Sequence, residues 1–150
     1  MNKNILITGG GGYVGSYLVP ILLKQDFNIT VYDRFYFNAN YLPNHKNLKI
    51  INGDIRDIKK LEKSLAKIDC VIHLACISND ASFELDKDLS KSTNLDCFEP
   101  LVKISKKESF KDNIYFCVFK FLNKKFFIYF ISYEIIFFKF TSLFLILLFS

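Results

Sequence analysis

Eight residues decide how this 150-residue chain folds: Thr8-Gly9-Gly10-Gly11-Gly12-Tyr13-Val14-Gly15. They fit a T-G-x-x-G-x-x-G pattern in which Gly9, Gly12 and Gly15 occupy the fixed positions. A short apolar run, 5–8, precedes this stretch, and an amphipathic run, 13–24, follows it. A buried strand, a glycine turn and a helix in this order are typical of the first unit of a parallel α/β sheet.

Each fixed glycine has a physical reason to be there. Gly9 permits a tight turn out of the strand, Gly12 has no side chain to hold a pyrophosphate away from the backbone, and Gly15 lets the helix pack close to the sheet. The helix then offers unpaired N–H groups, those of Tyr13 and Val14 among them, to phosphate oxygens. The stretch predicts a phosphate site for a dinucleotide; the alternative is a glycine-rich turn that only connects two elements.

Asp33 is the second feature of the predicted site. It ends a strand-like segment, 28–33, and follows Gly12 by 21 residues. A carboxylate there can accept hydrogen bonds from the adenosine ribose hydroxyls and would repel a 2′-phosphate, so the sequence favours NAD over NADP. Arg34 is an adjacent cation that works against this preference.

The chain continues the same alternation up to about residue 107. Its pattern predicts further strands at 48–51 and 70–74, and helices at 58–66 and 89–106. Pro20 is expected to kink the first helix without ending it, because the apolar periodicity continues past it. Strands that alternate with helices imply right-handed crossovers and a doubly wound parallel sheet, which is an α/β fold of the Rossmann-like class.

Three further motifs carry a resemblance to a known family. Gly53-Asp54-Ile55-Arg56-Asp57 follows the third predicted strand, His73-Leu74-Ala75 ends the fourth, and Asn94 lies on the helix after it. Together with the glycine turn, they resemble the extended short-chain dehydrogenase/reductase family, the NAD-dependent epimerases and dehydratases of nucleotide sugars. The resemblance covers about residues 3–107. It implies an NAD-binding domain but specifies no particular sugar.

The resemblance also implies which residues would bind the cofactor. Asp54 and Ile55 would contact the adenine, and the backbone at Leu74 and Ala75 would pass the nicotinamide ribose. His73 is expected to be a packed strand-end histidine without a catalytic role. The full set implied for NAD is Gly9, Gly12, Tyr13, Val14, Gly15, Asp33, Arg34, Asp54, Ile55, Leu74 and Ala75.

The catalytic part of the family pattern is missing from this sequence. Members of the family carry a Tyr-x-x-x-Lys pair after the fifth strand, in which the lysine lowers the pKa of the tyrosine that acts as acid and base. None of the eight tyrosines here has a lysine four positions later. We therefore expect an NAD-binding fragment of a nucleotide-sugar epimerase or dehydratase that is truncated, inactive alone and without assignable catalytic residues. One part of a split enzyme and a membrane-tethered nucleotide-binding module are the alternatives.

The composition changes abruptly near residue 109. All six glycines lie at or before Gly53, whereas 12 of the 17 phenylalanines lie within 110–150. We expect an NAD-binding domain over residues 1–109 and a Phe/Ile/Lys-rich tail over 110–150 that has no family resemblance. Residues 114–119 could replace the fifth strand.

Three interpretations remain open for the tail, one of which is an aberrant, aggregation-prone β segment, because the stretch is aromatic, β-branched and free of proline. A frameshift near residues 107–111 would leave an orphan segment rich in residues with A/T-only codons. A membrane anchor at 126–149 has the length to span a bilayer. However, Glu134 and Lys139 would each cost about 2.5 kcal/mol or more at its centre. We therefore favour the orphan tail.

Charge and cysteine usage exclude other classes of function. The net charge of +5 comes from dispersed lysines, which argues against a nucleic-acid partner. The four cysteines form no C-x-x-C pair and no metal-ligand spacing with the two histidines, so we expect buried free thiols in a reducing cytoplasm and no metal. No signal peptide is indicated at Met1.

Overall fold

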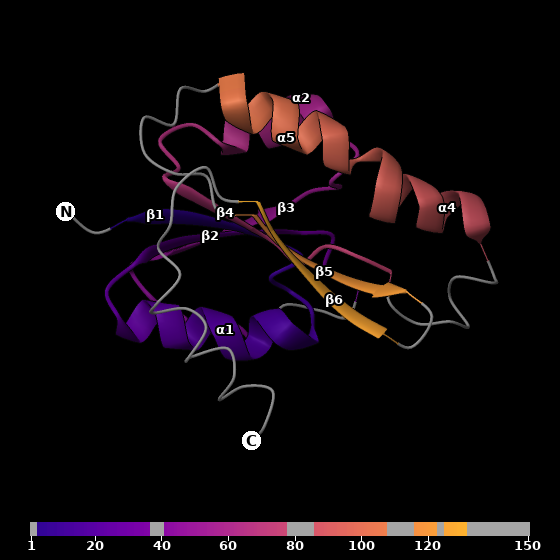
Figure 1. Ribbon diagram of the computed structural model, residues 1–150. Helices are drawn as coiled ribbons and strands as arrows, with labels where there is room; N and C mark the ends of the chain where they lie inside the picture. The colour runs from indigo at the N-terminus through magenta and orange to yellow at the C-terminus, as the bar shows by residue number, and fades with distance from the viewer. Residues whose placement is uncertain (1–2, 37–40, 78–85, 108–115, 123–124, 132–150) are drawn as a thin grey trace.

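The computed structural model describes residues 3–36, 41–77, 86–107, 116–122 and 125–131, and from residue 106 onward it describes the backbone alone. The described residues form one six-stranded sheet in the order β3-β2-β1-β4-β5-β6, with helices on both faces (Figure 1). The strands are β1 (Asn4–Thr8), β2 (Asn28–Asp33), β3 (Leu48–Asn52), β4 (Cys70–His73), β5 (Phe116–Leu122) and β6 (Lys125–Ile131). The helices are α1 (Tyr13–Lys24), α2 (Ile58–Ser64), α4 (Lys87–Lys91), the π-helical η1 (Ser92–Asp96) and α5 (Phe98–Lys107).

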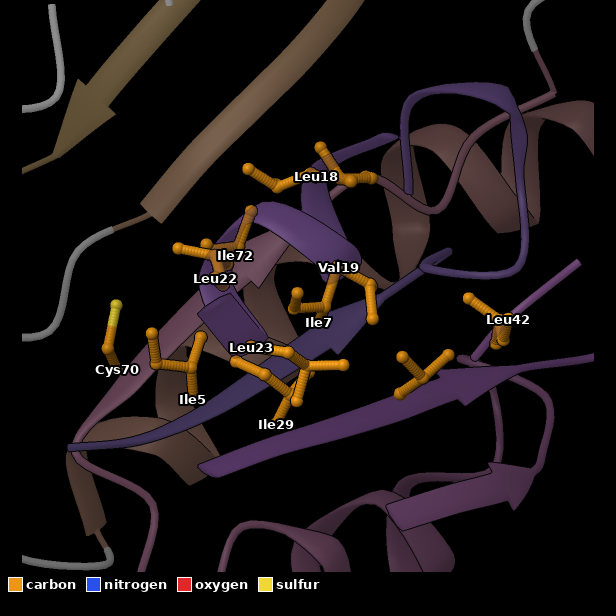
Figure 2. Packing of buried hydrophobic residues seen from close by; sticks show 12 residues of the cluster. Ile5, Ile7, Leu18, Val19, Leu22, Leu23, Ile29, Leu42, Cys70 and Ile72 are labelled. Atoms are coloured by element: carbon orange, nitrogen blue, oxygen red, sulfur yellow. The ribbon is translucent and has the colours of Figure 1, made fainter. Parts of the chain in front are cut away.

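The sheet buries one apolar layer on each face. Ile5 and Ile7 of β1 pack on the α1 side, while Leu6 between them packs on the side of α2 and α5. Figure 2 shows the α1 layer, in which helix residues such as Leu22 lie directly over the strands. Each fully buried leucine stabilises the fold by about 1.5–3 kcal/mol. The predicted doubly wound α/β fold is confirmed.

Helix α1 runs from Tyr13 to Lys24, as predicted, and it continues through Pro20. Proline at this position removes the hydrogen bond that its nitrogen would donate to the carbonyl of Ser16. Leu22 and Leu23, which follow the proline, are both buried against the sheet. Their burial outweighs the missing bond, so the helix ends only when its apolar residues end.

The last predicted helical segment, 89–106, is mostly helical, as predicted, and it consists of three consecutive helical segments. The π-helical turn η1 separates α4 from α5, and Asn94 lies within it. The Asn94 side chain accepts a hydrogen bond from the Ile77 N–H (2.7 Å) and donates one to the Ile77 carbonyl (2.9 Å). Pro100, in the first turn of α5, has no N–H for the Asp96 carbonyl. Both features disrupt the regular α-helical bonding that apolar periodicity alone predicts.

A strand, β5, occupies the position predicted for the fifth strand. β5 begins at Phe116 and pairs parallel to β4 through His73 and Val118, whereas β6 pairs antiparallel to β5. The strand predicted at 114–119 is therefore confirmed from residue 116 onward, and its first two residues lie outside the described part. In the segment considered as a membrane anchor, 126–149, the residues up to Ile131 belong to β6, and 132–149 lie outside the described residues. No helix in the described part is long and apolar enough to cross a membrane.

Candidate functional site

The predicted site residues gather at the carboxyl edge of the sheet. β1 and β2 end there at Thr8 and Asp33, and β4 ends there at His73. The chain leaves β1 toward β2 and β3 on one side, and the later strand β4 pairs with β1 on the other. Doubly wound sheets bind ligands at such a reversal of strand order, outside the carboxyl ends of the strands. The glycine turn lies at this reversal.

Two of the fixed glycines are required by packing within the protein. Gly9 has φ = 72°, and a Cβ added to it would lie 2.4 Å from the backbone nitrogen of Ala75. Its role in the turn is confirmed, and it also brings the β1 end against the segment after β4. For Gly15 the close neighbour is the Gly10 carbonyl oxygen, 2.1 Å from an added Cβ, rather than a strand. This glycine lets the turn fold onto the helix.

Gly12 is less crowded than the other two glycines. Among the described residues, a Cβ added there would meet one atom, the Gly9 carbonyl oxygen, at a tight but not prohibitive 3.3 Å, and its φ of −89° suits any residue. Within the described part of the chain, the N–H groups of Tyr13 and Val14 make no hydrogen bond, and Tyr13 is 81% exposed. Free donors at a helix N-terminus, beside a residue without a side chain, suit an anion.

Asp33 joins the end of β2 to the glycine turn. Its Oδ2 accepts a hydrogen bond from the Gly11 N–H (2.9 Å), and its Oδ1 accepts one from the Phe35 N–H (2.7 Å). The Tyr41 hydroxyl donates to the Gly11 carbonyl, so both the N–H and the carbonyl of Gly11 are hydrogen-bonded. Tyr41 was not predicted from the sequence, because no motif links it to Gly11, 30 positions earlier.

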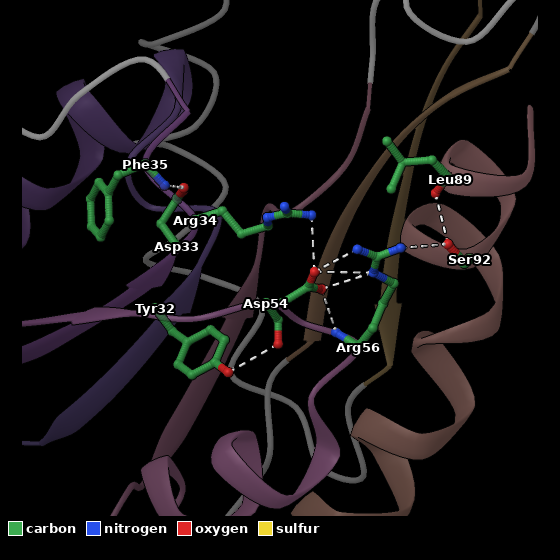
Figure 3. A network of polar contacts seen from close by, with 8 residues as sticks. All are labelled: Tyr32, Asp33, Arg34, Phe35, Asp54, Arg56, Leu89 and Ser92. Atoms are coloured by element: carbon green, nitrogen blue, oxygen red, sulfur yellow. Dashed lines mark hydrogen bonds and ion pairs between the residues drawn. The ribbon is translucent and has the colours of Figure 1, made fainter. Parts of the chain in front are cut away.

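Asp54 is the centre of a charged network at the same edge of the sheet (Figure 3). Its Oδ2 accepts hydrogen bonds from Arg34 (2.9 Å) and Arg56 (2.6 Å), and its Oδ1 accepts from the Arg56 backbone N–H (2.9 Å). Arg56 also donates to the Ser92 hydroxyl (3.3 Å). The hydrogen bond from the Arg56 side chain is the largest cause that holds the pKa of Asp54 below its usual value. The carboxylate therefore stays ionised.

Ile55 does not present its side chain to the site. The side chain is 3% exposed and packs in the core beside Tyr32, so the adenine contact predicted for Ile55 could come only from its backbone. Tyr32 donates a hydrogen bond to the Asp54 carbonyl (3.0 Å), and burial raises the pKa of Tyr32 to about 12. The apolar character of Ile55 serves the core.

The end of β4 offers backbone rather than side chains. Leu74 is buried, and its N–H donates to the Thr8 carbonyl (2.8 Å), while Ala75 lies against Gly9. His73 is buried beside Thr8, with 2.6 Å between Nδ1 and the threonine Oγ1. Burial lowers the pKa of His73 to about 4, so its ring is neutral near pH 7. Its surroundings are those of a packed strand-end histidine, as predicted.

The cysteines follow the expectation of burial in two cases and depart from it in one. Cys70 and Cys97 are buried and form no disulfide within the described part of the chain, and burial raises the pKa of Cys97 to about 11. Cys76, in contrast, is exposed, because it follows β4 where the chain leaves the core. Cys117 lies where only the backbone is described.

Known proteins resemble this chain over the same region. Residues 5–118 match the family model described as NAD dependent epimerase/dehydratase family. The UDP-glucose 4-epimerase of Neisseria meningitidis is 40% identical over 81 residues, an alignment that covers 49% of this chain and 24% of that protein. The chain thus spans about a quarter of the length of this curated relative.

Solved structures share the fold as well as part of the sequence. A UDP-N-acetylglucosamine 4-epimerase from Methanobrevibacter ruminantium M1, in complex with UDP-N-acetylmuramic acid, is 32% identical with a TM-score of 0.66. That match covers 73% of this chain and 36% of the other. The enzyme WbmF of Bordetella bronchiseptica, in complex with NAD+, is 28% identical with a TM-score of 0.66, over 73% of this chain and 34% of the other.

Proposed function

The chain belongs to the NAD-dependent epimerase/dehydratase family, and on that premise we propose that it is the NAD-binding part of a nucleotide-sugar epimerase or dehydratase. The observation that carries the proposal is the pair of N–H groups of Tyr13 and Val14 that have no partner among the described residues, beside Gly12, which has no side chain to cover them. A side chain at Gly9 or Gly15 would clash with backbone at 2.4 Å or 2.1 Å, whereas at Gly12 the contact is 3.3 Å, so packing constrains Gly12 much less. A ligand that approaches the backbone is the physical reason for glycine there.

The site residues suit successive parts of the NAD molecule. The pyrophosphate fits the N-terminus of α1, where the helix dipole favours negative charge. Asp33 retains unused lone pairs for the adenosine ribose hydroxyls, and its charge would repel a 2′-phosphate. The backbone at Leu74 and Ala75 is left for the nicotinamide ribose. Gly9 lies against Ala75, and its N–H donates to the Tyr32 carbonyl (2.9 Å), so it connects the segments that contain Ala75 and Asp33.

We propose further that this chain alone has no turnover. NAD, when bound, would accept a hydride from a sugar carbon, but a base must take the hydroxyl proton as the carbonyl forms. His73 is buried and neutral, and no tyrosine has a lysine four positions later. Nucleotide sugars are therefore the substrate class of the proposed parent enzyme, and residues 1–109 are its cofactor-binding part.

Substitution of Gly12 by valine tests the phosphate site. In the full chain, Gly12→Val should abolish NAD binding measured by calorimetry, because the branched side chain fills the space where the pyrophosphate would meet the backbone. Lys24→Val is the matched control, since it places the same side chain at the exposed far end of α1. If Gly12→Val bound NAD as well as the unmodified chain, with an unchanged circular dichroism spectrum, the phosphate site would lie elsewhere.

A further inference from the structure

The charged network beside Asp33 points to a residue that decides between NAD and NADP. We propose that Asp54 is a positioning residue: it holds the Arg34 guanidinium, so that this cation cannot serve a ribose 2′-phosphate. This inference rests on the proposed NAD site. Arg34 follows Asp33 directly and is the nearest candidate in the sequence for binding a 2′-phosphate.

Two contacts hold the guanidinium of Arg34. Its Nη1 donates to Asp54 Oδ2 at 2.9 Å, and its central carbon lies 4.4 Å from the centre of the Tyr36 ring. Figure 3 shows the side chain extending from the end of β2 to Asp54, whereas Asp33 is directed to the Phe35 N–H. The guanidinium of Arg34 and the carboxylate of Asp33 thus bind different partners, although the two residues are adjacent.

Arg56 fixes the acceptor that Arg34 uses. It binds the Asp54 carboxylate with its backbone N–H (2.9 Å), its Nε (2.9 Å) and its Nη2 (2.6 Å). Because three donors from one neighbouring residue hold it, the carboxylate has a set orientation toward Arg34. The Arg34 and Asp54 side chains are 38% and 26% exposed, so a ligand could reach the cation if the carboxylate were removed.

The charge balance predicts what that removal would do. Asp33, Arg34, Asp54 and Arg56 have formal charges that cancel, and Asp54→Asn would leave this group with one net positive charge. A phosphate binds arginine through short, charge-assisted hydrogen bonds. The asparagine Oδ1 can still accept from the Arg56 backbone N–H, so the turn after Gly53 is retained. Asp54→Asn should therefore free Arg34 without unfolding the site.

The experiment compares the affinities of NAD and NADP for the full chain by calorimetry, because these ligands differ only in the 2′-phosphate. In the unmodified chain, NAD should bind more tightly. Asp54→Asn should lower the Kd of NADP relative to that of NAD by about tenfold, the scale of one charge-assisted hydrogen bond. Asp26→Asn is the matched control, because it removes the same charge from the loop at the opposite end of β2 and should leave the ratio unchanged. Asp54→Ser, which also keeps an oxygen for the turn, should repeat the Asp54→Asn result.

A second experiment, in the Arg34→Ala variant, distinguishes an effect through Arg34 from a general effect of the added positive charge. In Arg34→Ala, the additional change Asp54→Asn should give no gain for NADP, and a gain that persisted would overturn the inference. So would an unchanged ratio in both Asp54→Asn and Asp54→Ser while NAD still binds. Failure of the unmodified chain to bind either cofactor would overturn the proposed function itself, and this inference with it.

Discussion

His73 shows how one buried residue links stability to pH. Its pKa is about 4 in the folded chain, against 6.5 for an ordinary histidine, because burial disfavours the charged ring. The unfolded chain therefore binds more protons between these values. Stability is full above pH 6.5 and falls as the pH drops toward 4, by about 3 kcal/mol in total.

This pH dependence should weaken when the ring is removed. His73→Asn keeps a polar atom near the position of Nδ1, beside the Thr8 hydroxyl, but cannot be protonated in this range. Urea unfolding at pH 7 and pH 4.5 should show a smaller loss for the variant than for the unmodified chain. Carboxylates contribute to both chains alike, so equal losses would contradict the role given to His73.

At the scale of elements, the β1–α1 turn combines tight packing at Gly9 with the proposed phosphate site at Gly12. Gly9→Ala should destabilise the chain by about 2 kcal/mol or more, because it combines a left-handed backbone with a close contact at Ala75. Gly12→Ala is the same chemical change three residues later, where the nearest atom is 3.3 Å away, and should cost about 1 kcal/mol or less. Chemical denaturation of both variants measures the difference. Equal losses would show that the turn relaxes around an added methyl group.

The elements that sequence analysis predicted best are those whose bounds are set by residues within or next to them. α1 and β2 have their predicted ends, because a glycine turn begins the first and the second contains the buried apolar residues Ile29, Val31 and Tyr32. The segment 89–106 is mostly helical, as predicted, but its regular α-helix is interrupted at η1, where Asn94 bonds the backbone of Ile77, 17 residues earlier. Periodicity within a helix contains no information about such a partner.

At the scale of the whole molecule, the prediction concerns turnover. The chain should show no epimerase or dehydratase activity with NAD and a panel of UDP-, GDP- and dTDP-sugars followed by chromatography. General acid–base catalysis contributes about 10²–10⁴-fold, and positioning of the sugar can contribute about 7–11 kcal/mol more. Turnover near the ordinary range of about 1–10³ s⁻¹ would contradict the proposal. It would require a base outside the Tyr-x-x-x-Lys pattern.

The sequence by itself determined the fold class and the edge of the sheet at which the residues of the proposed site lie. Glycine spacing, apolar periodicity and an acidic strand end are local properties, and parallel strands bring their carboxyl ends to one edge of the sheet. Only the tertiary structure decided which side chains remain available there. In that structure, the Ile55 side chain is buried in the core, Arg34 is paired with Asp54, and Gly9 lies against Ala75. These outcomes depend on packing and charge between segments distant in sequence, and such contacts exist only once the sheet has formed.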